Sequence, residues 1–127
     1  MSIFKVNIVA VNPVKEDLTT PAVEALVDTG SELTWLPAEL LSNIGIQPRR
    51  ERTFLTATKQ VVIRQVGYAI LRTEGFETTD EVVFAQPGDM TLLGVRTIEG
   101  FGVLVDNIAH RFVAQSTLAG AIYCILK

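Results

Sequence analysis

Short runs in which apolar and polar residues alternate, each closed by turn residues, constrain the fold of this chain more than any other feature. Phe4, Val6 and Ile8 alternate with more polar positions, which is the period of a half-buried strand. Further extended runs cover residues 23–27, 34–36, 49–57, 61–73, 82–85, 103–105, 111–114 and 122–126. Helical spacing is confined to residues 37–41 and 95–101. Many short strands with little helix predict an all-β barrel or sandwich.

The composition indicates one folded domain, which we expect to span residues 1–127. Of the 127 residues, 48% are hydrophobic and 20% are charged, and this balance excludes a disordered chain. The formal net charge of -3 argues against a nucleic-acid partner, which would need a basic surface. Lys5 and Asn7 interrupt the apolar start, and the apolar run at 118–126 is far shorter than the ~20 residues of a membrane span. We therefore expect a cytoplasmic protein with no membrane partner.

The single histidine and the single cysteine leave few kinds of catalysis open. His110 and Cys124 cannot build a four-ligand zinc site from nitrogen and sulfur within one chain. A serine or cysteine hydrolase would have to use His110, whose neighbours contain no nucleophile motif, so we interpret His110 as a surface or turn residue. We expect no metal and no cofactor. Acid–base chemistry by carboxylates is the chemistry that remains available.

The segment Asp28-Thr29-Gly30-Ser31 is the main candidate for such chemistry. An apolar strand at residues 23–27 delivers a carboxylate into a turn whose next members are a hydroxyl residue and a glycine. Gly30 is free to adopt a positive φ. Taken alone, this tetrapeptide suits any ordinary turn, and only its context can give it another meaning.

That context is a second motif much later in the chain. Leu92-Leu93-Gly94 is a hydrophobic pair closed by a glycine and followed by a short helical segment, and a long hairpin with its tip near Lys59 lies between the two motifs. In this order the pieces resemble the retropepsin-like aspartic proteases, most of all the cellular microbial members, from about residue 4 to residue 114. The resemblance implies an all-β acid-protease barrel with a flap hairpin and one or two short helices.

The resemblance further implies an aspartic endopeptidase with Asp28 as its catalytic residue. In this class two carboxylates share one proton and activate a water molecule, with no cofactor. The chain has one Asp-Thr-Gly, so the second carboxylate would come from another copy of the chain in a two-fold homodimer. The substrate would be a peptide or protein. Asp89 and Asp106 lack a Thr-Gly context, and we interpret them as surface or turn acids.

The same resemblance assigns supporting roles next to Asp28. Thr29 would hydrogen-bond across the dimer axis and lock the two loops together. Gly30 would let the backbone approach the substrate. The Ser31 hydroxyl would bond the outer carboxylate oxygen of Asp28 and favour its charged form, which would give a more acidic working range than that of retroviral enzymes.

Other family roles fall on residues further from the turn. Leu93 and Gly94 would pack beneath the active-site loop and support it. Trp35 would line a substrate pocket, with packing in the core as an equal alternative. Glu32 and Arg96 would form an ion pair between the loop and the following helix, although Arg96 is offset by one position from its place in the family.

The flap of the resemblance corresponds to residues near the tip of the long hairpin. We expect Thr56, Ala57, Thr58, Lys59 and Gln60 to contact the substrate. This segment lacks the glycines of the viral flap, so the sequence leaves open which residue forms the tip and how the flap closes.

Two points stay open on the sequence alone. Residues 115–127 extend beyond the last matched strand, and they could join a dimer sheet through residues 122–126 or add an element to the core of one subunit. The function could also be that of a catalytically inactive dimeric module of the same fold that binds peptides or proteins, or the chain could be an unrelated small β-barrel in which Asp-Thr-Gly is a turn.

Overall fold

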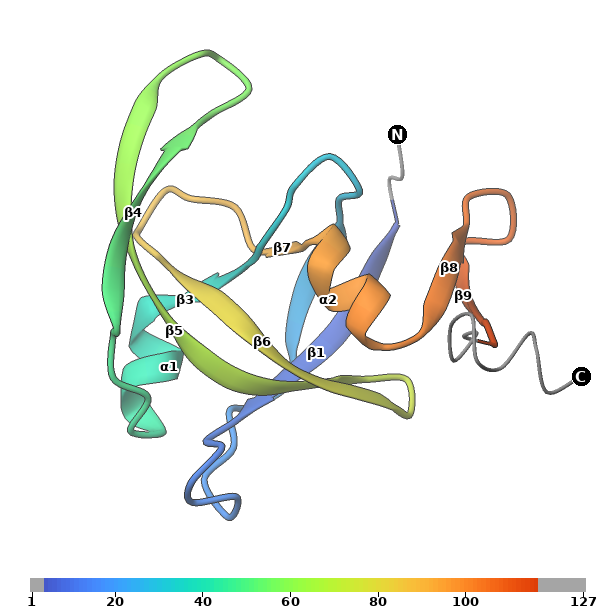
Figure 1. The fold of residues 1–127 in the computed structure, drawn as a ribbon, viewed down its shortest axis with the longest axis horizontal. Coiled ribbons are helices and arrows are strands. Elements are labelled where there is room, and N and C mark those ends of the chain that lie inside the picture. The colour runs from blue at the N-terminus through green and yellow to red at the C-terminus, as the bar shows by residue number, and fades with distance from the viewer. Residues whose placement is uncertain (1–3, 117–127) are drawn as a thin grey trace, which may run out of the picture.

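The structure, a computed structural model, describes residues 4–116 and confirms the all-β fold with two short helices (Figure 1). Within these residues the elements are β1 Lys5–Val11, β2 Val23–Val27, β3 Thr34–Pro37, α1 Ala38–Asn43, β4 Arg50–Leu55, β5 Val61–Thr73, β6 Phe76–Ala85, β7 Leu92–Leu93, α2 Val95–Gly100, β8 Val103–Asp106 and β9 Arg111–Ala114. The strand predicted at residues 122–126 and Cys124 lie outside the described residues.

Seven of the strands form one sheet in the order β1-β2-β7-β3-β6-β5-β4. The long strand β5 pairs along one edge with β6, and its other edge is shared between β4 near the start and β1 near the end. We assign no closed barrel to this arrangement. Because β6 pairs only with the second half of β5, the β4–β5 hairpin extends beyond the rest of the sheet. It lies on the same side as the loop after β2 and the loop before β7 (Figure 1).

The buried faces of the strands follow from the alternation in the sequence. Val6, Ile8 and Ala10 of β1 are buried, whereas Lys5 and Asn7 are exposed and Val9 is half-buried. Burial of a valine or isoleucine side chain such as Val6 or Ile8 contributes roughly 1.5–3 kcal/mol. The main core also takes apolar residues from β2, β3, β5, β6 and both helices, and a small second cluster forms beneath the β4–β5 hairpin.

Tight turns set the register of the two long hairpins. Glu74 and Gly75 join β5 to β6, and both have positive φ, at 51° and 85°. Two consecutive positive φ values match the twist of the flanking strands in a two-residue hairpin, which is why the turn predicted at these residues is found there. In the β4–β5 hairpin the residue with positive φ is Lys59, at 63°.

Two predicted boundaries were wrong, and each has a physical reason. The helix predicted at 37–41 is α1, Ala38–Asn43, because Pro37 still pairs with Ala85 as the last residue of β3. The strand predicted at 82–85 is the end of β6, which already begins at Phe76. Its first half is polar and alternates between half-buried and exposed positions, so it carries no apolar signal.

The β8–β9 hairpin forms a separate two-stranded sheet beside the start of β1. His110 lies in its connecting turn with φ 54°, and its ring stacks on Phe4 at 5.5 Å between centroids. Asp106 accepts hydrogen bonds from the backbone N–H groups of Ile108 and Ala109 at 3.0 and 2.9 Å. The interpretation of His110 as a surface or turn residue is confirmed, and Asp106, the last residue of β8, accepts the bonds that close this turn.

Candidate active site

Hydrogen bonds to strand β7 and to the loop that follows Asp28 hold this residue at the end of β2. Its backbone N–H donates to the Leu93 carbonyl of β7 at 3.0 Å, continuing the parallel pairing of β2 with β7. Its side-chain Oδ1 accepts the Gly30 N–H at 2.9 Å, and its carbonyl accepts the Ser31 N–H at 3.1 Å. These bonds fix both the backbone and the carboxylate of Asp28, and they require Gly30 to approach closely.

The loop after Asp28 rests on the start of α2. The N–H of Val95 donates to the Ser31 carbonyl at 2.8 Å, and the N–H of Gly94 donates to the Thr34 hydroxyl at 3.0 Å. That hydroxyl also contacts the Thr97 hydroxyl at 2.6 Å, and both threonine residues are fully buried. Gly94 thus packs against the loop, together with two buried threonines that the sequence did not single out.

A cavity of about 770 Å³ lies between this loop and the β4–β5 hairpin. It is lined by Asp28, Gly30, Ser31, Glu32, Leu33, Trp35, Phe54, Leu55, Thr56, Ala57, Thr58, Val62, Gly88, Asp89, Met90 and Leu92. Of the other expected site residues, Leu93 is buried behind the cavity and Thr29 is exposed outside it. Lys59 and Gln60 follow the lining residue Thr58 along the hairpin but do not themselves line the cavity.

Trp35 lies at the boundary between the cavity and a small apolar cluster. It lines the cavity and also packs against the small cluster of Leu33, Val66 and Val83. Its ring meets that of Phe54 edge to face, with 5.0 Å between centroids. Such aromatic pairs add about 0.5–1.5 kcal/mol beyond the area that they bury. Trp35 therefore joins β3 to the hairpin and gives the cavity an apolar wall.

The structure also identifies the tip of the hairpin. Ala57 and Thr58 form its turn, closed by bonds from the Lys59 N–H to the Thr56 carbonyl and from the Thr56 N–H to the Gln60 carbonyl, each at 2.9 Å. Lys59 occupies the left-handed conformation that glycine usually adopts. The hairpin thus closes tightly without the glycines of the viral flap.

The expected contact between Ser31 and the carboxylate of Asp28 was wrong. The Ser31 hydroxyl donates instead to the Leu33 carbonyl at 2.8 Å, within the same loop. The carboxylate takes its hydrogen bond from the Gly30 backbone. The argument for a more acidic working range, which depended on the hydroxyl, is therefore removed.

Replacing Ser31 with Ala is expected to leave the pH profile of any activity in place and to cost only about 1 kcal/mol of stability, the net value of one hydrogen bond. Activity measured from about pH 3 to about pH 7, together with urea denaturation, tests this expectation. A displaced pH profile in Ser31→Ala would show that the hydroxyl contacts the carboxylate after all.

The predicted ion pair between Glu32 and Arg96 was also wrong. The link between loop and helix is a backbone bond from the Arg96 N–H to the Glu32 carbonyl at 3.1 Å. The Glu32 side chain pairs with Arg52 of β4 at 3.4 Å, and the Arg96 side chain pairs with Glu81 and Asp80 of β6 at 3.1 and 3.2 Å. The Glu32 side chain therefore links the loop after β2 to strand β4 of the hairpin.

Glu81 connects these ion pairs from beneath the hairpin. Its side chain is only 8% exposed, and it pairs with Arg50 at 2.8 Å, Arg96 at 3.1 Å and Arg52 at 3.8 Å. The hydrogen bond from Arg50 is the largest of the causes that hold the pKa of Glu81 below its ordinary value, against the opposite effect of burial. A charged residue so enclosed orients β4, β6 and α2 relative to one another.

A further ion pair joins the β4–β5 hairpin to the loop before β7. Arg64 of β5 makes two hydrogen bonds to the carboxylate of Asp89, at 2.7 and 2.9 Å, and both side chains are less than one-fifth exposed. Asp89 also accepts the Gln86 N–H at 2.8 Å. The bond from Arg64 is the main cause that lowers the pKa of Asp89. Asp89 is thus the turn acid that the sequence predicted, with an ion pair that it did not predict.

Replacing Asp89 with Asn is expected to destabilise the protein by about 1.5–3 kcal/mol near neutral pH, the range for a hydrogen bond to a charged group. Because folding lowers the pKa of Asp89, its contribution is complete above the unfolded pKa of about 4 and is lost as the pH falls through the native value. The difference in unfolding free energy between the two proteins should therefore shrink below about pH 4.

Urea denaturation of both proteins at several pH values measures this difference. Glu24→Gln provides the control, because Glu24 forms an exposed ion pair with Lys5 at 3.5 Å, and it should change stability little at any pH. If the difference in unfolding free energy between Asp89→Asn and the unmodified protein stayed constant between about pH 6 and about pH 3, the ion pair between Asp89 and Arg64 would not stabilise the fold.

A carboxylate on a strand-end turn, facing a cavity beneath a β-hairpin and backed by a Leu-Leu-Gly strand and short helix, defines the retropepsin-like aspartic proteases. The chain belongs to the family described as "gag-polyprotein putative aspartyl protease", whose model matches residues 18–99. No curated protein is similar enough in sequence to count as a match.

Two foamy viral structures share the fold of this chain at low sequence identity. A foamy viral protease-reverse transcriptase in complex with an RNA/DNA hybrid has a TM-score of 0.54 and 18% identity, over 76% of this chain and 12% of that chain. A second foamy viral protease-reverse transcriptase structure, with double-stranded DNA, has a TM-score of 0.51 and 19% identity, over 74% and 15%. This chain therefore spans only 12–15% of the length of those foamy viral chains. A retropepsin-like aspartic protease from Rickettsia conorii is 21% identical over 82% of this chain and 84% of that chain, with a TM-score of 0.47.

Proposed function

We propose that this protein is a homodimeric aspartic endopeptidase whose catalytic pair is Asp28 and the Asp28 of a second copy. One observation carries the proposal: Asp28 lines a cavity of about 770 Å³ together with hairpin residues Thr56, Ala57 and Thr58. A cavity of this size is in the range of ligand sites in proteins. An extended peptide lying in it would contact the carboxylate from one side and the hairpin from the other.

The chemistry needs two carboxylates and one water molecule. Two carboxyl groups so close together share one proton, because both cannot carry a charge at once. The ionised one takes a proton from the water, whose oxygen attacks the carbonyl carbon of the peptide bond, while the protonated one donates to the carbonyl oxygen. When the tetrahedral intermediate collapses, the C–N bond breaks and the amine leaves with a proton from the pair. The two residues exchange roles, so the pair titrates as a unit.

The second copy is needed because one chain supplies one such carboxylate. Thr29 is exposed, next to Asp28 and outside the cavity, which suits a residue that bonds its counterpart across a two-fold axis. The Gly30 N–H bond to Asp28 Oδ1 would hold each carboxylate in position, and it leaves the other oxygen available for the shared proton and the water.

Cleavage of a mixed peptide library, followed by mass spectrometry from about pH 3 to about pH 7, tests the proposal. We expect new peptide termini that disappear on addition of pepstatin, and a specific activity that rises with protein concentration as dimers form. Sedimentation equilibrium measures the dimer directly. A dimer that retains peptides but cuts none would instead establish a binding module of the same fold.

A further inference from the structure

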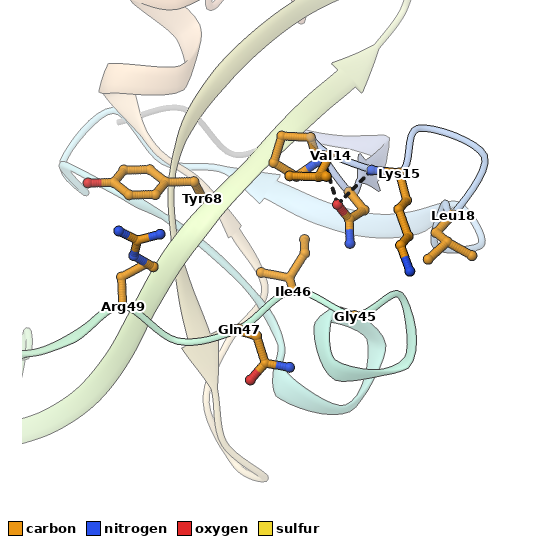
Figure 2. A pocket seen from close by; sticks show the side chains of 10 residues that line it. Val14, Lys15, Leu18, Gly45, Ile46, Gln47, Arg49 and Tyr68 are labelled. Carbon is orange, nitrogen blue, oxygen red and sulfur yellow. Dashed lines mark hydrogen bonds between the residues drawn. The ribbon is translucent and has the colours of Figure 1, made fainter.

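A second cavity, of about 400 Å³, lies away from Asp28 and shares no lining residue with the first. It lies where the β1–β2 loop meets the segment between α1 and β4, and its far wall is the middle of β5 (Figure 2). The lining residues are Asn12, Pro13, Val14, Lys15, Leu18, Gly45, Ile46, Gln47, Arg49 and Tyr68.

Asn12 fixes the shape of this cavity. Its side-chain amide donates to the Ile44 carbonyl at 2.8 Å, and its Oδ1 accepts the N–H groups of Val14 and Lys15 at 2.9 and 3.0 Å. The Asn12 side chain is buried, so these bonds have little competition from water. The β1–β2 loop is thereby fastened to the end of α1. A preformed wall lowers the entropy lost when a ligand binds.

The charge on the rim of the cavity is entirely positive. Its lining includes two cationic residues and no acidic residue. Among residues 4–116, Lys15, Arg49 and Lys59 are the cationic side chains with no carboxylate within 4.0 Å, and two of these three line this cavity. The Arg49 guanidinium lies over the Tyr68 ring at 5.9 Å from its centroid, which orients it without neutralising it.

The cationic groups and the apolar groups are arranged along a line. Figure 2 shows Arg49 and Tyr68 at one end and Lys15 and Leu18 at the other, with Ile46 between them. Ile46 is buried, whereas Val14 and Tyr68 are 87% and 46% exposed. A small inorganic anion would engage one end and leave the apolar surface uncovered. An elongated ligand with negative charges at both ends and an apolar centre matches the whole cavity.

We propose that this cavity binds an acidic peptide segment in which apolar residues are flanked by carboxylates on both sides. The carboxylates would pair with Lys15 and Arg49, and the apolar side chains would pack against Val14 and the Tyr68 ring, above the buried Ile46. The Gln47 side chain can donate to or accept from the peptide backbone between them. The site does not depend on proteolysis, because it shares no residue with the cavity at Asp28.

Fluorescence anisotropy with a labelled Glu-Glu-Leu-Leu-Glu-Glu peptide tests the site. The protein carries Asp28→Asn, so that cleavage cannot consume the probe. We expect saturable binding to this protein and at least about a tenfold loss when Lys15→Gln and Arg49→Gln are added. The matched control adds Lys5→Gln and Arg111→Gln, which remove the same charges from exposed residues elsewhere and should leave the affinity unchanged.

Three further measurements make the result decisive. The peptide with Gln in place of every Glu should bind at least about tenfold more weakly, and this needs no change to the protein. Amide resonances of Gly45, Ile46 and Tyr68 should shift on addition of the acidic peptide. No binding, equal losses in the two double variants, or shifts confined to residues at Asp28 would overturn the proposal. Variant-sensitive binding to phosphatidylserine vesicles without peptide binding would overturn it in favour of an anionic membrane surface.

Discussion

Replacing Asp28 with Asn is expected to reduce peptide cleavage by at least about 10²–10⁴-fold, the usual contribution of general acid–base catalysis. The amide has nearly the same shape as the carboxylate, and its oxygen can still accept the Gly30 N–H, so the loop should keep its conformation. It can neither take a proton from water nor share one with its counterpart. Circular dichroism and urea denaturation should show an unchanged fold.

Mixing the unmodified protein with Asp28→Asn separates a shared site from two independent sites. In an equal mixture that has exchanged subunits, only about a quarter of the dimers carry Asp28 on both copies. If each site takes one carboxylate from each copy, only these dimers are active. The activity should therefore fall to about a quarter of that of the undiluted unmodified protein. A fall to about a half would show that each subunit acts alone.

Replacing Gly94 with Ala is expected to destabilise the protein by about 3 kcal/mol or more, at the upper end for overpacking. An added Cβ would lie 2.4 Å from the Leu33 carbonyl oxygen and 2.5 Å from its carbonyl carbon. Both are backbone atoms, so relief requires the loop after Asp28 to move away from α2. The Gly94 N–H bond to Thr34 and the Val95 N–H bond to Ser31 would then be strained. We expect activity to be lost together with stability.

Gly75→Ala is the matched control for this effect. Gly75 has φ 85° in an exposed turn, and an added Cβ would meet no atom within 4 Å. That substitution should cost only about 1 kcal/mol, through the backbone conformation alone. Urea midpoints and m-values of the two variants measure the contrast. Equal losses in Gly94→Ala and Gly75→Ala would mean that the close approach to Leu33 is not what Gly94 provides.

The parts of the fold that depend on local chemistry could be predicted from the sequence. The alternation in β1 and the Glu74-Gly75 turn are determined by nearest neighbours, and both were found where the sequence placed them. Residues 76–81 of β6 were missed because the first half of the strand is largely polar, and because Glu81, which follows it, is buried only through its ion pairs with arginines of β4 and α2. No periodicity within one strand can reveal a charge that is neutralised from two others.

At the candidate active site, too, local contacts could be predicted and contacts between distant segments could not. Asp28 and Gly30 could be placed by their motif, because the bond between them spans two residues of one turn. The partners of Ser31, Glu32 and Arg96 could not, since they depend on which carbonyl or strand lies within reach after the sheet has formed. The ion pair between Asp89 and Arg64 could not be predicted either, because it requires the register of β5 against the loop before β7.

The bond from the Asp28 N–H to the Leu93 carbonyl also has a consequence for folding. It joins segments separated by the whole of the β4–β5 hairpin and β6. Contacts between residues so distant in sequence form late, since a long loop must close first. A chain emerging from the ribosome would thus have no positioned carboxylate until residue 93 is free to dock. Synthesis itself would then delay the appearance of any hydrolytic activity until most of the domain has been made.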